Sequence, residues 1–364
     1  MGESATPVKA VHEAASSSAP PPPPTSAQIP PRPASKPVGE LYRIRPWHTV
    51  IVLTLALLLD LPFLIDRLAL SPYTSHTTGG VLVTGASTGI GRDSAITLAT
   101  KEPGLIVYAG VRNLRDAKAI TALHLPNLLP VTLDVTKDNS VQAARRTILK
   151  DLASRGPEPD NPLPFVGLVN NAGVTGMAPL EHHALPEVEK IFAVNVFGLL
   201  RVTQAFLPEI RKHQGRIINI SSVLGALTVS SFAAYSASKH AMESLSDGLR
   251  RELRPFGVSV SVIQPGFVAS PIHAKAETAA PSPSFPASTD YPHLSTPAKR
   301  AHLVRCRAHA ASPRSTSAAV ADALLQPFPR TRYPVAAVDR VPAVVFTLAA
   351  AILPDRVMDS WLEA

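Results

Sequence analysis

The sequence predicts an α/β fold built on a doubly wound parallel sheet. Between residues 78 and 275, short apolar runs alternate with helical patterns, the first run enters a glycine-rich turn, and later runs end in small or polar residues. Strands that alternate with helices favour a parallel sheet with helices on both faces. In such folds ligands bind at the carboxyl ends of the strands. We therefore expect a site where the apolar runs end.

Length, composition and charge narrow the remaining possibilities. The chain has 364 residues, 45% of them hydrophobic, a net charge of +8 and one cysteine, Cys306. This length fits one large α/β domain with appendages or two small domains. A lone cysteine cannot form an internal disulfide. The basic residues lack interleaved aromatic residues or a known binding motif, so we expect no nucleic-acid partner, and we predict no metal site.

The N-terminal segment, residues 1–46, differs in composition from everything after it. It contains the proline run Pro20 to Pro24, clustered serine and alanine, and almost no large apolar side chains. Such a segment cannot bury enough apolar surface to offset its ordering entropy. We predict a disordered, partly polyproline tail; a ligand for a proline-binding domain is the alternative.

Residues 47–70 predict a single membrane-anchor helix. The stretch is mostly apolar, and it approaches the ~20 residues that cross a bilayer if Asp60 lies near one end. A signal peptide, an interfacial helix and a buried helix are the alternatives. Arg43 and Arg45 precede it, while Asp60 and Asp66 lie toward its other end. By the positive-inside rule this favours a cytosolic tail, and the reverse orientation stays open. We predict an endomembrane location, such as the endoplasmic reticulum.

The first predicted strand, residues 79–84, enters a glycine-rich turn, and a helix follows from Arg92. The turn reads Thr84-Gly85-Ala86-Ser87-Thr88-Gly89-Ile90-Gly91. Glycines remove the Cβ atoms that would block close approach, so backbone N–H groups and the positive helix terminus can face a pyrophosphate. A turn placed after the first strand and before a helix is the context of a Rossmann-like dinucleotide site.

The next two strands carry residues expected near the adenosine half of a dinucleotide. The second strand, residues 105–109, is followed by Arg112 with no acidic residue before it. An arginine suits the 2′-phosphate of NADP, whereas an NAD site usually offers a carboxylate, so we predict NADP(H). The third strand, residues 130–135, brings Asp134 and Val135 to the adenine side, and a helix follows at 140–152.

The fourth strand, residues 165–169, ends in Asn170-Asn171-Ala172-Gly173. We expect the amide side chains to tie neighbouring strands and the small residues to leave room for a cofactor. A long helix from Leu185 to Pro208 then carries Asn195. A polar asparagine in such apolar surroundings needs hydrogen-bond partners.

The chemistry is predicted between Ser222 and Lys239. The fifth strand, 216–220, ends just before Ser222, which places its hydroxyl at the carboxyl edge of the sheet as a donor to a carbonyl oxygen. Tyr235 and Lys239 are four residues apart and share one helix face. A free phenol titrates near pH ~10. Because a neighbouring ammonium favours the phenolate, we expect a lowered pKa for Tyr235.

These motifs together resemble the short-chain dehydrogenase/reductase family over about residues 78 to 275. The matching residues are Thr84 to Gly91, Asn170 to Gly173, Asn195, Ser222, Tyr235 to Lys239 and Pro265-Gly266. Their joint order and spacing carry the resemblance. Two further stretches, 250–258 and 331–335, resemble the retinol and 17β-hydroxysteroid dehydrogenase branch of that family.

The resemblance implies a role for each matching residue. Tyr235 would be the general acid in carbonyl reduction and the base in alcohol oxidation. Lys239 would lower its pKa and bind the nicotinamide ribose, Ser222 would polarise the substrate oxygen, and Asn195 would hold a water linking Lys239 to solvent. Ser270 stands where many relatives carry a threonine that contacts the carboxamide. The residues predicted to line the cofactor are Thr84, Gly85, Ser87, Gly89, Ile90, Gly91, Arg112, Asp134, Val135, Asn171, Ala172, Tyr235, Lys239, Pro265, Gly266, Val268 and Ser270.

The helix after Tyr235 carries Leu245, Leu249 and Leu253 at four-residue spacing. In the short-chain dehydrogenase/reductase family, which this chain resembles, the corresponding helix commonly forms a dimer interface. The apolar stripe of these three leucines is therefore either part of the core or the surface of a homodimer. The helix is predicted to stop at Pro255 and Gly257. A sixth strand, residues 258–263, then enters Gln264-Pro265-Gly266.

The C-terminal part is predicted to complete the substrate side of the site. Residues 271–314 form a long connection rich in proline, serine and alanine, and we expect a flexible substrate lid at 276–316. Its basic residues are either a solvated surface or a contact with anionic lipid heads. Residues 317–364 are expected to complete the domain. The apolar stretch 341–354 is short for a membrane span and predicts a helix that closes the pocket or lies in the membrane interface.

The predicted protein is a membrane-anchored oxidoreductase that moves a hydride between NADP(H) and a secondary alcohol or carbonyl of an apolar substrate. A retinoid, a steroid and a lipid ketone all fit a site fed from a bilayer. The alternative is a non-catalytic NADP(H)-binding membrane scaffold. The complete set of Asn195, Ser222, Tyr235 and Lys239 argues against that alternative.

Overall fold

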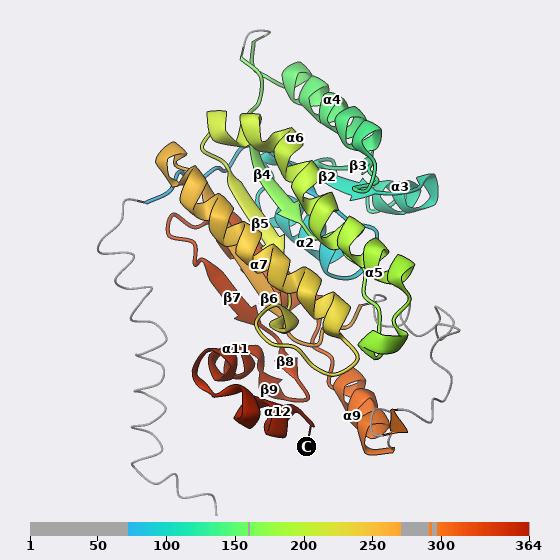
Figure 1. Ribbon diagram of the computed structural model, residues 1–364. Helices are drawn as coiled ribbons and strands as arrows, with labels where there is room; N and C mark the ends of the chain where they lie inside the picture. Colours follow the sequence, from blue (N-terminus) through green and yellow to red (C-terminus); the bar gives the residue numbers. More distant parts are fainter. Residues whose placement is uncertain (1–71, 159–160, 271–290, 293–296, 364) are drawn as a thin grey trace, which may run out of the picture. The chain divides into compact units, whose positions relative to one another are not determined.

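The computed structural model describes residues 72–158, 161–270, 291–292 and 297–363. The predicted tail and anchor, residues 1–46 and 47–70, lie outside the described residues, as does most of the first half of the predicted lid. The described chain forms a seven-stranded parallel sheet with helices on both faces (Figure 1). This confirms the predicted α/β fold with a Rossmann-like, doubly wound sheet.

The strand order in the sheet is β3-β2-β1-β4-β5-β6-β7, and all neighbours pair in parallel. The order reverses between β1 and β4, which is the position where ligand crevices open in sheets of this type. β7 joins the sheet beyond β6 and was not predicted as a strand. The bounds are β1 Gly79–Val83, β2 Leu105–Val111, β3 Leu128–Thr132, β4 Phe165–Asn170, β5 Arg216–Ile220, β6 Ser259–Pro265 and β7 Arg332–Val335.

Helices connect the strands, and a small antiparallel hairpin follows the sheet. The helices are α2 Gly89–Lys101, α3 Leu114–Thr121, α4 Asp138–Ser154, α5 Leu185–Phe192, α6 Leu199–Lys212, α7 Ala233–Leu253, α9 Pro297–Ala308, α10 Pro313–Leu325, α11 Ala343–Ile352 and α12 Asp355–Glu363. The shorter elements are the turns η1 Leu180–His182, η2 Ala193–Gly198, η3 Val223–Gly225 and η4 Arg254–Phe256, with the hairpin strands β8 Ala337–Val338 and β9 Val341–Pro342.

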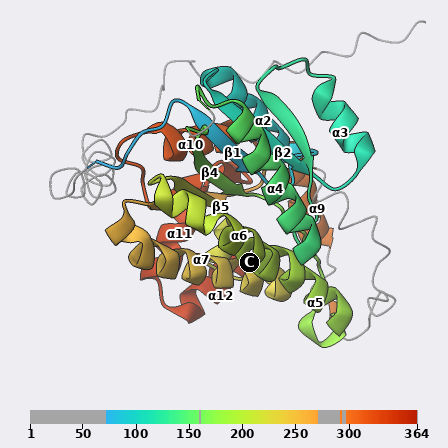
Figure 2. The ribbon, with the colours of Figure 1, turned by 90° about the horizontal axis from the view of Figure 1, so that it is seen from above.

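Two apolar cores flank the sheet, one on each face. On one face α2 and α10 pack together, with Leu98 and Val320 fully buried. On the other face α4 and α6 cover the strands, and Phe206 stacks on Phe165 of β4 with ring centroids 4.7 Å apart. Figure 2 shows the sheet between α10 on one side and α6 and α7 on the other. Burial on both faces explains why the strands read as continuous apolar runs in the sequence.

The predicted helix from Leu185 to Pro208 is longer and less regular than expected. α5 passes through the π-helical turn η2 into α6, which continues beyond Pro208 to Lys212. By length and composition this helical run could cross a membrane, and it is the one such run in the described residues. Its Val202, Phe206 and Ile210 are fully buried against the sheet, so we interpret it as a core helix.

The predicted long connection before residue 316 is partly helical. Its described portion contains α9 and the start of α10. Ser312 caps α10 through a hydrogen bond that its hydroxyl accepts from the Arg314 N–H, 3.4 Å, and Pro313 occupies the first turn. Proline is favoured there because its missing N–H would have no helical partner.

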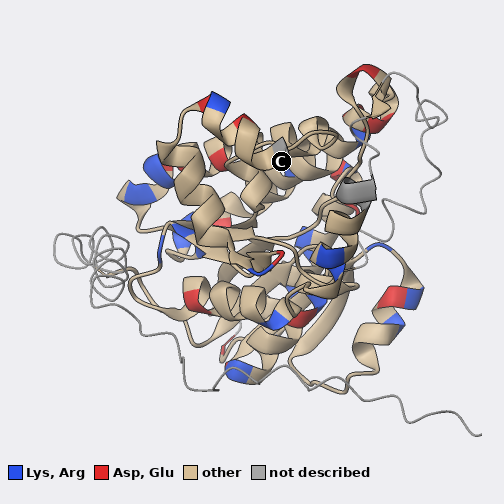
Figure 3. Ribbon diagram, turned by 90° about the horizontal axis from the view of Figure 1, so that it is seen from below, with Lys and Arg blue, Asp and Glu red and all other residues tan. Residues whose placement is uncertain are grey.

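Viewed from below in Figure 3, basic and acidic residues are interspersed on the described chain.

The end of α7 agrees with the sequence prediction. The helix stops at Leu253, the turn η4 contains Pro255, and Gly257 adopts φ +67°, a left-handed conformation that favours glycine. Leu253 is buried, and Leu249 packs against the α4 and α6 core. These two leucines of the predicted stripe therefore belong to the core of this chain.

The amino end of β5 holds a fully buried cation, Arg216. Its Nη1 donates to the carbonyls of Ala323 and Gln326, at 2.9 and 2.5 Å, and its Nη2 donates to the carbonyl of Thr74 at 2.9 Å. The first two carbonyls belong to the C-terminal end of α10, where backbone acceptors lack helical partners. Arg216 thus ties α10 and the segment before β1 to the sheet.

Candidate active site

The glycine-rich turn packs tightly against the end of β4. Gly85 and Gly89 have φ of +64° and +57°, values that glycine adopts most readily. A Cβ on Gly85 would lie 2.8 Å from the Cα of Ala172, and one on Gly91 would lie 2.2 Å from Nδ2 of Asn171. Sequence reasoning assigned these glycines to close approach of a ligand. In the structure they also permit close packing within the protein.

The N-terminal end of α2 is open to an anion. Its N-cap residue, Thr88, makes no side-chain capping hydrogen bond, and the first turn contains no acidic residue. The first backbone N–H groups of a helix carry a partial positive charge and lack helical acceptors. This arrangement fits the pyrophosphate of a dinucleotide, with Ser87 and Ile90 beside it and only partly exposed.

Thr84, Asn171 and Ala172 hold the turn in place. The Thr84 hydroxyl oxygen accepts from the backbone N–H groups of Asn171 and Ala172, both at 3.0 Å. The Asn171 side chain donates to the carbonyls of Thr84 and Gly85, at 2.9 and 3.1 Å. In β4, Asn170 donates to Oδ1 of Asn219 on β5, 2.9 Å. The expectation that the amide side chains tie neighbouring strands is confirmed.

On the adenosine side, Arg112 follows β2 and is exposed. Asp134 follows β3, and its Oδ1 accepts from the Thr136 backbone N–H at 3.0 Å and hydroxyl at 2.7 Å. Burial raises the pKa of Asp134, but the Thr136 hydrogen bonds and the charges of Lys137 and Arg112 outweigh it, so this pKa lies below its usual value. Asp134 therefore stabilises its own turn through hydrogen bonds. Arg112 lies close enough for its charge to affect the Asp134 carboxylate. Val135 is buried.

Ser222 and Tyr235 meet at the carboxyl edge of the sheet. The Ser222 side chain is hydrogen-bonded to the Tyr235 hydroxyl, and its oxygen also accepts from the Leu224 N–H at 3.1 Å. Burial raises the pKa of Tyr235 to about 12, against the opposing effect of the Ser222 hydrogen bond. The lowered pKa expected from the sequence is therefore not found in the protein alone. Desolvation of the phenolate dominates.

Lys239 lies one helical turn beyond Tyr235, as predicted. Its Nζ is 5.7 Å from the centroid of the Tyr235 ring and donates to the carbonyl of Ile220 at 2.8 Å. The side chain is 4% exposed. Burial lowers the pKa of Lys239 to about 8, and the charge of Glu243 partly opposes this effect. Lys239 is thus a buried amine that titrates close to physiological pH.

Asn195 lies in the π-helical turn η2 and is fully buried. Its Oδ1 accepts from the Val174 N–H, and its Nδ2 donates to the Val174 carbonyl, both at 2.9 Å, and to the Ser238 hydroxyl at 3.0 Å. These contacts occupy the asparagine side chain with protein partners. A water bound by this residue would need its main-chain carbonyl or the second lone pair of Oδ1. π-Helical turns often mark functional sites, and no pattern in the sequence predicts this one.

The segment after β6 closes the predicted nicotinamide side. A Cβ on Gly266 would lie 2.6 Å from the carbonyl oxygen of Ala337 in β8, which explains the glycine after Pro265. Val268 is 2% exposed and pairs with Ala311 in an isolated bridge. Ser270 is partly exposed and is the last described residue before 271.

A buried charged group beside Lys239 escaped sequence reasoning. Glu243 is 8% exposed; it accepts from Nε2 of Gln264 and from Nε of Arg332, both at 3.0 Å. The spacing of Tyr235, Lys239 and Glu243 at four-residue intervals was available as a signal. Among the described residues, no group of three His, Cys, Asp or Glu side chains is placed to hold a metal ion.

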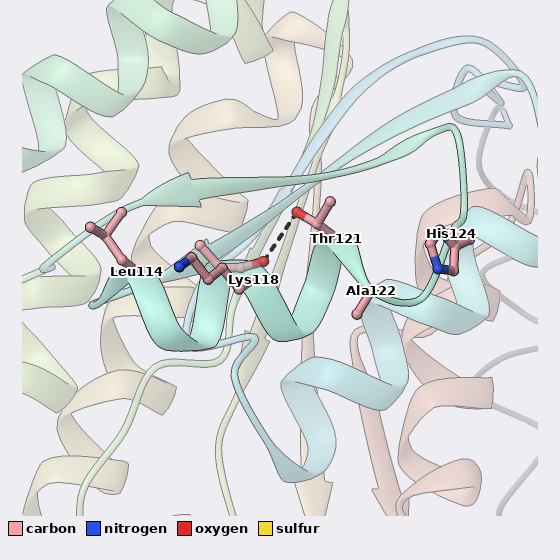
Figure 4. A pocket seen from close by; sticks show the side chains of 6 residues that line it. Leu114, Lys118, Thr121, Ala122 and His124 are labelled. Carbon is pink, nitrogen blue, oxygen red and sulfur yellow. Dashed lines mark hydrogen bonds between the residues drawn. The ribbon is translucent and has the colours of Figure 1, made fainter.

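A shallow hollow lies along the exposed face of α3 (Figure 4). It encloses about 410 Å³ and is lined by Leu114, Ala117, Lys118, Thr121, Ala122 and His124. The Thr121 hydroxyl donates to the Ala117 carbonyl at 3.2 Å, so this polar group is already used within the helix. None of the predicted site residues lines the hollow, and we assign no chemistry to it.

Comparison with known proteins places this geometry in context. Residues 80–281 match the family described as short chain dehydrogenase. The chain is 40% identical over 199 residues to 3-amino-tetrahydro-pyrrolizinone reductase of Xenorhabdus hominickii, covering 55% of this chain and 65% of that protein. It is 37% identical over 222 residues to 17-beta-hydroxysteroid dehydrogenase type 6 of Bos taurus, covering 59% of this chain and 65% of that protein. The chain thus spans less than two thirds of the length of these curated relatives.

A solved structure supports the same fold. The short chain dehydrogenase of Burkholderia cenocepacia in complex with NADP superposes with a TM-score of 0.57 at 26% sequence identity, covering 78% of this chain and 97% of that one. The glycine turn, the Ser222 and Tyr235 pair and Lys239 all fall within the family match at residues 80–281.

Proposed function

The chain belongs to the short chain dehydrogenase family, and from this premise we propose that it is an oxidoreductase that transfers a hydride between NADP(H) and a secondary alcohol or carbonyl of an apolar substrate. The observation that carries the proposal is the hydrogen bond between Ser222 and Tyr235, with Lys239 one turn away. These groups lie at the sheet edge that also carries the open N-terminal end of α2. The bound nicotinamide would supply or accept the hydride.

The protein groups divide the remaining work. In reduction, the Tyr235 hydroxyl gives its proton to the carbonyl oxygen while the Ser222 hydroxyl donates a hydrogen bond to that oxygen. The raised pKa of Tyr235, about 12, keeps the phenol protonated near neutral pH, which is the form that reduction requires. In oxidation, the Tyr235 phenolate takes the proton of the alcohol, and a nearby ammonium on Lys239 stabilises that phenolate before the transfer.

The apolar substrate is supported by the element that faces the turn after Ser222. α11 contacts η3 and β7, and its sequence, AVVFTLAAAI, contains one polar residue. Relatives include retinol dehydrogenase 5 of Mus musculus, 34% identical over 193 residues. Retinoids, steroids and lipid ketones are therefore the substrate classes that we propose to test first.

A substrate screen tests this proposal. Purified protein with NADPH is offered retinal, steroid ketones and long-chain keto lipids, and NADPH consumption is followed by its absorbance. Turnover of one class supports the proposed function and names the substrate. Tight NADPH binding without turnover on any of the three would favour the non-catalytic scaffold instead.

NADP(H) as the cofactor rests on Arg112. The 2′-phosphate is close to dianionic at neutral pH, and a guanidinium can meet it with paired, charge-assisted hydrogen bonds. Such a bond contributes roughly 1.5 to 3 kcal/mol, and ~1.4 kcal/mol is tenfold in affinity. Arg112 lies at the end of β2 and acts electrostatically on Asp134 after β3, so it stands on the side where the 2′-phosphate is expected.

We predict that Arg112→Ala weakens NADPH binding about ten- to a hundredfold and leaves NADH binding nearly unchanged. Binding of both cofactors is measured by fluorescence titration at low and high salt. Salt should weaken NADPH more than NADH in the unmodified protein. Arg115→Ala, on the next exposed arginine of α3, is the matched control. An equal loss for both cofactors, or a natural preference for NADH, would contradict the assignment.

We propose that residues 47–70 anchor the protein to an endomembrane. The support is the apolar run in the sequence, and the basic residues after residue 296 offer a second contact, with anionic lipid heads. In the described residues, Arg305 lies 3.2 Å from Asp339 and is paired rather than free.

We predict that removing residues 1–70 frees the protein from membranes without unfolding it. The cut leaves the segment that binds the domain, in which the Tyr73 N–H donates to the Pro327 carbonyl at 2.9 Å and Arg216 donates to Thr74. Carbonate extraction of membranes measures attachment, and circular dichroism measures folding. Carbonate-resistant association of the truncated protein would instead indicate the C-terminal helices.

A further inference from the structure

Glu243 occupies a central position behind the candidate active site. It follows Lys239 by four residues on α7, which places the two side chains on one helix face about 6 Å apart along the axis. It is 8% exposed. A carboxylate this deeply buried requires partners of opposite charge or hydrogen-bond donors.

Both carboxylate oxygens of Glu243 have such partners. Oε1 accepts from the Gln264 side chain and Oε2 accepts from Arg332 of β7, each at 3.0 Å. Arg332 also contacts Asp247, one turn further along α7, at 3.1 Å. Asp247 in turn contacts Arg250 at 3.1 Å. The charges therefore alternate along a chain that begins at Lys239.

The same carboxylate contacts two segments that build the site. A Cβ on Gly225 would lie 3.1 Å from Cγ and 3.2 Å from Oε1 of Glu243, so the turn after Ser222 rests directly on it. Gln264 immediately precedes Pro265 and Gly266, on the predicted nicotinamide side. Glu243 thus joins α7, η3, β6 and β7 at a single point.

Lys239 has few other charged neighbours. The groups that act on it in the described structure are the Tyr235 ring, the Ile220 carbonyl and the charge of Glu243. Burial favours the neutral amine, and Glu243 favours the ammonium. Arg332 has the opposite influence, because it shares the Glu243 carboxylate and neutralises part of its charge.

We propose that Glu243 is a positioning residue that keeps the buried Lys239 side chain charged, and that Arg332 sets how strongly it does so. The proposal deepens the proposed function and rests on it, because a charged Lys239 is what stabilises the Tyr235 phenolate. It predicts effects of opposite sign for the two members of one ion pair. A purely structural pair would give losses of the same kind from either side.

The test reads Lys239 directly in the protein without cofactor. Lysine is labelled with ¹³C at Cε, the Lys239 signal is identified by its absence in Lys239→Met, and its chemical shift is followed against pH. Glu243→Gln keeps the size of the side chain, removes the charge, and replaces one of the two acceptor oxygens with an amide donor. Its titration midpoint should fall by about one pH unit, since an opposite charge at this range shifts a pKa by one to three units. Arg332→Gln should move the midpoint upward.

Asp247→Asn is the matched control. Asp247 binds the same arginine but lies two turns from Lys239, about 12 Å along the helix. Charges at that range are largely screened. The Lys239 titration midpoint in Asp247→Asn should therefore stay within about 0.3 pH units of its value in the unmodified protein. Once a substrate is known, the pH profile of NADPH-dependent reduction gives a second readout. Its fall on the alkaline side should begin about one pH unit lower in Glu243→Gln than in the unmodified protein.

Two results would overturn the proposal. One is an unchanged Lys239 midpoint in both Glu243→Gln and Arg332→Gln, and the other is a shift in the same direction in both. If Glu243→Gln fails to fold, Arg332→Gln decides alone by the sign of its shift. The titration needs neither cofactor nor substrate, so its failure is distinct from a failure to find turnover.

Discussion

The two ends of β5 each bury a cation, and they use it differently. Arg216 is the first residue of the strand and is 1% exposed, while Lys239 donates to Ile220, the last residue, and is 4% exposed. Burial lowers the pKa of both, to about 10 for Arg216 and about 8 for Lys239. The same physical cost is therefore present at both ends of one strand.

The difference lies in how many of the donors are used by the protein itself. Arg216 donates to three main-chain carbonyls from two distant segments. An ammonium has three N–H donors, and in the described structure the Lys239 ammonium donates to one carbonyl. Arg216 gives three hydrogen bonds to the fold, and its buried Nε has no partner in the described structure, so its role is to hold segments of the fold together. Lys239 retains donors that a ligand can accept, which is what the proposed cofactor ribose and the Tyr235 phenolate require.

The largest expected effect comes from a substitution at the carboxyl end of β5 alone. Tyr235→Phe should reduce turnover by roughly 10² to 10⁴ while leaving NADPH affinity within a few fold, because the ring still packs but the transferable proton is gone. Stability should change little, since the variant loses one hydrogen bond, about 1 kcal/mol. Steady-state kinetics and NADPH titration measure the two quantities. Retention of more than about a tenth of the activity would show that another group supplies the proton.

The next largest effect is on stability and comes from a substitution at the amino end of β5 alone. Arg216→Met keeps the length of the side chain but leaves the carbonyls of Ala323, Gln326 and Thr74 without their donor. Each buried acceptor without a partner costs about 1–3 kcal/mol, so we expect a loss of roughly 3–5 kcal/mol, of the size seen when buried ionic contacts are broken. Urea unfolding measures it, and turnover per folded molecule should be preserved.

Arg216→Lys gives the matched comparison. It keeps the charge but cannot span three carbonyls, so its stability should fall between those of Arg216→Met and the unmodified protein. A stable Arg216→Met protein would mean that the carbonyls find other partners, and the contrast between the two strand ends would then be lost.

Sequence reasoning reached one end of β5 and missed the other. Ser222, Tyr235 and Lys239 follow from the strand pattern and the four-residue helical spacing, both of which are local. Arg216 was counted only as the start of a strand, because its partners lie 142 residues earlier, at Thr74, and 107 residues later, at Ala323. Contacts at such separations leave no mark on a local pattern.

The same limit explains two further differences. The pKa of Tyr235 was expected to fall because its neighbour Lys239 is visible in the sequence, whereas the burial that raises it is not. Glu243 was missed because its partner Arg332 lies 89 residues later, in a strand that was not predicted. The glycine turn, the β1 to β6 strands and the stop of α7 were predictable because hydrophobic period and turn residues determine them.

The smallest effect is also the one that separates the two cations most sharply. Lys239→Met removes a buried charge whose pKa is about 8 in the folded protein against 10.5 normally. Between these values the unfolded chain binds more protons, so this group's contribution to stability rises with pH from about 8 to about 10.5, and its full cost is present below pH 8. The difference of 10.5 − 8 = 2.5 units corresponds to about 3 kcal/mol, of which about 1–3 kcal/mol is offset because the Ile220 carbonyl loses its donor.

We therefore expect Lys239→Met to be as stable as the unmodified protein at pH 7 or up to about 2 kcal/mol more stable, with the difference shrinking as the pH approaches 10. Glu243 keeps its partner Arg332, so no buried charge is left alone. Urea unfolding at pH 7 and at pH 9.5 measures both values, with Arg216→Met at the same pH values as the comparison. If Lys239→Met lost as much stability as Arg216→Met, Lys239 would stabilise the fold in the same way as Arg216. Its donors would then be needed by the protein rather than by a ligand.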